Sequence, residues 1–145
     1  MKKLLYLLLI SVLCVSCWER EDSEPGPADA FVGQYEFTNY YSSTMGGDYA
    51  GSFTLQGRLT LKKLSANKVK MTGGWSSVGE VVGNTVTFSD DYFSDVIGHI
   101  NYSFDVATLD GDILRFNYHG TGELKEDGVL TPYTCAGQVT ARKLD

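Results

Sequence analysis

The stretch Phe53-Thr54-Leu55-Gln56-Gly57-Arg58-Leu59-Thr60-Leu61-Lys62 decides the fold class, because apolar and polar residues alternate along it. Phe53, Leu55, Leu59 and Leu61 fall on one face, with Gly57 in the same register. Such alternation is that of a half-buried β-strand, whose apolar face packs on a core. We therefore expect a strand here, with these residues pointing inward.

The same alternation recurs along the rest of the chain, and no segment shows a convincing helical period. Turn residues divide this pattern into about eight strands, the number expected for a small closed barrel. The sequence thus predicts an all-β fold, a single antiparallel up-and-down β-barrel. The predicted strands are 31–41, 51–64, 67–73, 78–82, 84–89, 99–108, 112–123 and 130–143.

The predicted links alternate in length. Tight turns are expected at Ser65-Ala66, Gly83-Asn84 and Asp110-Gly111. Longer links are expected at 42–50, 74–77 and 90–98. Because alternate links of a meander lie at the same end, this pattern predicts a closed base and a loop-rich mouth. Gly46 and Gly47 in the first long link would let it move as a lid.

The N-terminus has the composition of a secretory signal, with Lys2-Lys3 followed by an apolar run that ends near Cys17. This run is too short to cross a bilayer. Ser16-Cys17 resembles the lipobox of bacterial lipoproteins, in which the cysteine is acylated. The resemblance implies removal of 1–16, lipidation of Cys17 and an anchor in the membrane. The alternative is an ordinary secreted protein with a chance cysteine.

The segment after Cys17 is acidic and contains Pro25-Gly26-Pro27, so we interpret 17–30 as the lipidated cysteine and a tether, and 31–145 as the barrel domain. The acidic cluster resembles the export signal that sends lipoproteins of the Bacteroidetes to the outer surface of the outer membrane. A solvated linker is the alternative. The cluster consists of Glu19, Glu21, Asp22 and Glu24.

Composition limits the partners. The formal net charge is −6, and removal of Lys2 and Lys3 makes it more negative by two. The other positive residues are scattered singly or in pairs, which argues against nucleic acid as a partner. Once Cys14 has left with the signal and Cys17 is acylated, Cys135 stands alone, so no internal disulfide is possible. Cys135 is expected to be a small buried apolar residue.

The segment Phe31-Val32-Gly33-Gln34-Tyr35-Glu36-Phe37 resembles the first strand of lipocalin-like domains of small Bacteroidetes lipoproteins, with Tyr35 where lipocalins have Trp. In lipocalins this aromatic residue plugs the barrel base, and a basic residue of the last strand lies across it. The resemblance therefore implies that Gly33, Tyr35 and Arg142 close the barrel. We expect a cation–π contact between Tyr35 and Arg142, with Lys143 as the alternative partner.

No motif places catalytic or metal-binding groups. His99 and His119 lie in different predicted strands without zinc-ligand spacing, and no complete calcium-binding loop is present. Gly74-Trp75-Ser76-Ser77-Val78-Gly79 is not a nucleophile elbow, because neither serine has glycine two residues away on both sides. We therefore expect no enzyme activity, no metal and no cofactor.

Aromatic residues gather in or beside the predicted long links, where exposed rings would mark a contact surface. They are Tyr40, Tyr41, Tyr49, Trp75, Tyr92 and Phe93. One hypothesis is that the mouth binds a small apolar or glycan ligand. The other is that the loops bind an envelope protein, as an inhibitor or accessory subunit with a filled barrel. A cavity of roughly 300 Å³ or more would favour the first hypothesis.

Overall fold

The computed structural model describes residues 24–145. The predicted signal, Cys17 and the first part of the tether lie outside the described residues. The described part contains the 3-10 helix η2 (Pro27–Ala30) and ten strands. The strands are β1 (Gly33–Met45), β2 (Asp48–Ser65), β3 (Lys68–Thr72), β4 (Ser77–Val82), β5 (Thr85–Phe88), β6 (Asp91–Asp95), β7 (Gly98–Phe104), β8 (Ala107–Asp110), β9 (Ile113–Glu126) and β10 (Val129–Lys143).

The strands form one antiparallel sheet that closes on itself. Its order is β10-β1-β2-β3-β4-β5-β8-β9, and pairing of β10 with β9 completes a ring of eight strands. The predicted all-β, antiparallel, up-and-down architecture is therefore confirmed. Two further strands, β7 and β6, extend from β9.

The ring is complete over only part of its height, because β9 has two successive neighbours on one side. β8 pairs with the start of β9, whereas β7 pairs with its later residues from Tyr118 to Leu124. The predicted strand 99–108 is thus interrupted at Asp105-Val106. We call the region of β3, β4, β5 and β8 with the adjoining ring strands the closed half. The open half comprises β6, β7 and residues 38–45, 48–57, 117–126 and 129–138.

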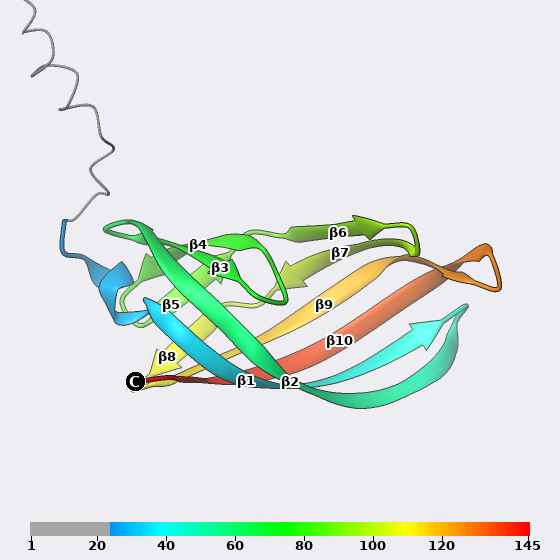
Figure 1. Cartoon of the computed structure of the whole chain (residues 1–145), viewed down its shortest axis with the longest axis horizontal. Coiled ribbons are helices and arrows are strands. Elements are labelled where there is room, and N and C mark those ends of the chain that lie inside the picture. The colour runs from blue at the N-terminus through cyan, green and yellow to red at the C-terminus, as the bar shows by residue number, and fades with distance from the viewer. Residues whose placement is uncertain (1–23) are drawn as a thin grey trace, which may run out of the picture.

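Two predicted long links are in fact strands, so the expected loop-rich mouth is wrong. Residues 42–45 continue β1 and pair with both β2 and β10, which leaves only Gly46-Gly47 as a turn. The predicted link 90–98 contains β6, which pairs with β7 from Asp91 to Asp95. In Figure 1 the β1–β2 and β6–β7 hairpins lie on opposite sides of β9 and β10. Backbone pairing holds both segments in extended strands.

The closed half is filled by side chains. The alternation that predicted inward Leu59 and Leu61 is confirmed, since both are buried. Large rings occupy the centre, and Phe88, Phe104 and Phe116 pack with their centroids 6.1 Å apart. Burial of apolar surface contributes about 25 cal/mol per Å² to the free energy of folding, so this core is the main source of stability. In the open half, Cys135 is buried, as its setting predicted.

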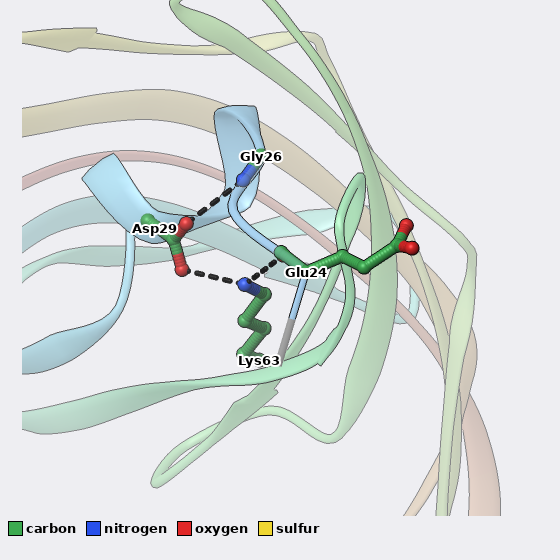
Figure 2. A network of polar contacts seen from close by, with 4 residues as sticks. All are labelled: Glu24, Gly26, Asp29 and Lys63. Atoms are coloured by element: carbon green, nitrogen blue, oxygen red, sulfur yellow. Dashed lines mark hydrogen bonds and ion pairs between the residues drawn. The ribbon is translucent and has the colours of Figure 1, made fainter. Parts of the chain in front are cut away.

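Residues 24–30, predicted to be tether, are packed on the closed end of the barrel. The ammonium of Lys63 in β2 binds the carbonyl oxygen of Glu24 at 2.6 Å and Oδ1 of Asp29 at 2.7 Å (Figure 2). Asp29 also accepts a hydrogen bond from the amide of Gly26 through Oδ2. Ala28 is fully buried, and its amide donates to Ala66. The structured domain thus begins before the predicted boundary at Phe31.

The closed end is completed by Lys143 rather than Arg142. Tyr35 is buried and its hydroxyl donates to the carbonyl of Phe31, while Gly33 lies against the aliphatic chain of Lys143. Arg142 is exposed and pairs across the sheet with exposed Glu36, one position out of the inward register of Tyr35. The expected contact of Tyr35 with Arg142 is therefore wrong. Lys143, the alternative, donates to the carbonyl oxygen of Ala30 at 3.1 Å.

Candidate functional site: an aromatic cleft in the open half

The barrel opens at its side, between β2 and β6. β3 pairs with β2 only from Thr60 onward, so among residues 24–145 the segment 48–59 of β2 is bonded to β1 alone. β6 is the last strand in the order of the sheet, and it pairs with β7. The strands that would fill the gap end at Thr72 and begin again at Ser77. This opening exposes the inward face of the open half.

The deeper part of the opening is a chamber of about 190 Å³. Its walls come from β1, β2, β7, β9 and β10, and its floor is the link between β3 and β4. We call it the inner chamber. It is lined by Phe37, Asn39, Tyr41, Leu55, Gly74, Trp75, Tyr102, Tyr118, Tyr133 and Cys135.

A wider hollow of about 560 Å³ adjoins the inner chamber beneath β6 and β7, and shares Gly74, Trp75 and Tyr102 with it. We call it the outer groove, and the two together the aromatic cleft. The remaining residues that line the groove are Thr72, Gly73, Ser76, Asp91, Tyr92, Phe93, Ile97, Ile100 and Leu124. The chamber alone is below the volume that favours a small-molecule site, whereas the groove exceeds it.

Trp75 separates the filled core from the cleft. Its indole is 8% exposed, and its centroid lies 5.8 Å from that of Phe37, 5.7 Å from Phe116 and 5.1 Å from Tyr118. Rings at these separations make favourable tilted and edge-to-face contacts. One side of the indole is therefore part of the core, and the other is the floor of the cleft.

The inner chamber contains no Asp, Glu, Lys, Arg or His side chain. Burial raises the pKa of Tyr118 and of Tyr133 to about 12, and burial also raises the pKa of the Cys135 thiol. These groups are thus uncharged at neutral pH. In the outer groove Asp91 accepts hydrogen bonds from the amides of Ser76 and Tyr92. The inner chamber is consequently a neutral, low-polarity surface with hydroxyl groups at intervals, whereas the outer groove carries the carboxylate of Asp91.

Asn39 is the polar exception in the chamber wall. It occupies the inward register of β1 between Phe37 and Tyr41, and it is 2% exposed. Its Nδ2 donates to the hydroxyl of Tyr118 at 2.9 Å. Within residues 24–145, its Oδ1 has no hydrogen-bond donor. A buried acceptor without a donor costs about 1–3 kcal/mol, so the wall of the chamber contains one unused hydrogen-bonding group, whose oxygen atom is itself buried.

Of the six aromatic residues predicted to form a contact surface, four line the cleft. Tyr41, Trp75, Tyr92 and Phe93 do so, although Trp75 is buried rather than exposed. Tyr40 lies on the outer face of β1, and Tyr49 lies near the β1–β2 turn, where its hydroxyl contacts Oγ of Ser52. The structure thus joins four of these residues in one site and separates the other two.

Several residues of the chamber have no sequence signal beyond the alternation of their strands. Tyr102 and Tyr118 fall in the predicted strands 99–108 and 112–123, and Asn39 and Tyr133 fall in the predicted strands 31–41 and 130–143. A detectable signal was Asn39 itself, a polar residue in the apolar register of Phe37 and Tyr35. A polar residue at an inward position commonly marks a site, because it requires a partner.

Other hollows and polar groups offer less. A hollow of about 710 Å³ lies on the outer face of β1, β2 and β10 around the ion pair of Arg58 and Glu36, whose side chains are 70% and 57% exposed. Nothing excludes water there. Across residues 24–145, no group of three or more His, Cys, Asp and Glu side chains is placed to hold a metal ion.

No protein-family model matches this chain, and no curated protein is significantly similar to it. Among the residues that the structure describes, none of the helices has the length and apolar character needed to span a bilayer.

Proposed function

We propose that this protein is a binding module, anchored to the bacterial outer membrane through acylated Cys17 and facing the cell surface, whose aromatic cleft captures a small uncharged ligand. The observation that supports binding is the cleft: six aromatic rings line a neutral chamber that is open to solvent at the side of the barrel. Apolar pockets with few polar groups are typical of small-molecule sites. Within the part of the chain that the structure describes, no arrangement of acid, base and nucleophile supports catalysis.

Binding is tested with a neutral fluorescent naphthylamine dye and by native mass spectrometry of the full chain. The informative substitution is Leu55→Arg, because Leu55 lines the chamber and is 51% exposed. A guanidinium at that rim should lower dye affinity by about tenfold or more, since a charge is costly beside apolar surface.

The matched control is Leu64→Arg in the same strand. Leu64 is 47% exposed and lies outside the cleft, so the same charge change should leave dye affinity unaltered. Equal loss of affinity in both variants, or no binding of any neutral probe by the wild type, would contradict the proposed function.

The proposed anchor has its own test. Labelled acyl chains should attach to the wild-type chain and to Cys14→Ser, but not to Cys17→Ser. Attachment that survives Cys17→Ser would contradict the assignment, and protease accessibility of the domain in intact cells would distinguish the outer surface from the inner face of the membrane.

A second candidate function, binding of an envelope protein, is favoured by the unpaired edge of β2. Residues 49–57 carry no charged side chain, and exposed edges of this kind accept a further strand. A photo-crosslinker at Thr54 should then capture one envelope protein. The same group at Thr140, in a strand paired on both sides, should not. Equal capture at both positions would contradict this function.

A further inference from the structure

The unused acceptor of Asn39 defines what the inner chamber can bind. Oδ1 has no donor among the described residues, although Nδ2 is engaged by Tyr118. Reversal of the side-chain amide would exchange the two atoms and leave the other one unused, so one hydrogen bond remains open in either case. A ligand that supplies this bond gains affinity that an apolar molecule of equal shape does not.

The size and walls of the chamber limit the ligand to about one ring. A cavity of roughly 150 Å³ lined by apolar side chains accommodates benzene, and this chamber measures about 190 Å³. Its walls are aromatic faces and edges, which favour a planar ring by stacking and edge-to-face contact. Larger substituents would extend into the outer groove.

The low polarity of the chamber favours an aromatic ligand over a sugar. A sugar ring carries several hydroxyls, and each would need a partner when withdrawn from water. The amide of Asn39 supplies one open position. A single hydroxyl on an aromatic ring matches this one open position. The hydroxyl donates to Oδ1 in the orientation described, or accepts from Nδ2 if the amide is reversed.

We infer that the inner chamber binds a neutral phenol, with the ring between Trp75 and the surrounding tyrosines and the hydroxyl hydrogen-bonded to the side-chain amide of Asn39. This inference rests on the proposed function, and it names the ligand class of the same site. The absence of charged side chains from the chamber walls excludes an anionic aromatic acid as a favoured ligand.

The test compares para-cresol with toluene, which differ by one hydroxyl, by equilibrium dialysis against the full chain. Para-cresol should bind about tenfold more tightly than toluene, the gain expected when a buried acceptor obtains a donor. In Asn39→Leu the preference should disappear. In Tyr118→Phe it should persist, because the amide remains. Para-hydroxybenzoate, the anionic control, should bind no better than toluene.

The outcomes separate the two proposals. Equal binding of para-cresol and toluene by the wild type, or a preference that survives in Asn39→Leu, would overturn the phenol site while leaving a binding cleft in place. If Asn39→Leu fails to fold, the wild-type ratio decides by itself, and loss of both probes in Leu55→Arg locates them in the chamber. Binding of neither probe overturns the phenol site, and absence of naphthylamine binding as well contradicts the proposed function.

Discussion

Replacement of Trp75 by alanine should remove a large part of the free energy of unfolding of this domain. The indole is 8% exposed and has aromatic neighbours at 5.1 to 6.2 Å. Truncation of a buried aromatic side chain to alanine costs about 3–5 kcal/mol, against a total of about 5–15 kcal/mol for a typical domain. Because the cleft lets water enter on one side, we expect about 3–4 kcal/mol here.

The surrounding backbone cannot move inward to reduce this cost. A side chain at neighbouring Gly73 would already meet the carbonyl oxygen of Arg58 at 2.5 Å, so the link is packed tightly against β2. Trp75→Phe should lose less stability, since a ring remains to contact Phe37 and Phe116. The control is Tyr92→Ala, which removes an aromatic ring that is 60% exposed and should change stability by less than about 0.5 kcal/mol.

Urea denaturation followed by far-ultraviolet circular dichroism measures these differences, with equal slopes required before midpoints are compared. A loss below about 1 kcal/mol for Trp75→Ala would refute the assignment of the indole to the core. The result also bears on binding experiments. Loss of a ligand or partner on Trp75→Ala would report unfolding, whereas Tyr92→Ala and Phe93→Ala test the surface itself.

Three further predictions follow from close contacts and shifted pKa values. Gly137→Ala places a methyl group 2.4 Å from a ring carbon of Tyr118, so it should cost about 1–3 kcal/mol in the same denaturation assay and alter the chamber; unchanged stability would contradict this packing. The bond to Lys63 lowers the pKa of Asp29 below its ordinary 3.8, so this contact stabilises the fold above about pH 4 and is lost as pH falls through the lower folded value. Asp29→Asn should therefore be less stable than wild type at neutral pH, and the two should converge in acid. Burial raises several tyrosine pKa values from 10.0 to about 12, so stability should fall as pH rises from 10 towards 12, and ultraviolet titration should show phenols that ionise only with unfolding. These phenols belong to Tyr35, Tyr118 and Tyr133.

The alternation of residues was sufficient to predict the fold class and the inward faces of most strands, because that pattern reflects burial directly. It did not predict how well each inward residue is covered. Phe53 and Leu59 share the same register in β2, yet Phe53 is 46% exposed and Leu59 is 1% exposed. The difference arises because β3 pairs only with the second part of β2, a long-range fact that no local pattern contains.

The sequence pattern predicted the opening at the wrong part of the barrel, again because long-range strand pairing is not visible in a local pattern. Segments 42–50 and 90–98 are rich in glycine, serine and aspartate, residues that favour loops in local terms. Pairing of Ser43 with Cys135 and of Phe93 with Ile100 keeps them extended. Tertiary pairing thus overrides local preference, and the site appears where strands are absent rather than where loops are long.

The position of β1 also determines how the domain would carry a mechanical load. β1 is bonded along its length to β2 on one side and β10 on the other, and the chain enters it from the packed segment held by Lys63. A pull on the N-terminal segment, opposed by a molecule held in the cleft, would run parallel to β1. Such a force shears two ladders of hydrogen bonds together instead of opening them one at a time, so the geometry resists extraction of the strand that joins the domain to its N-terminal segment.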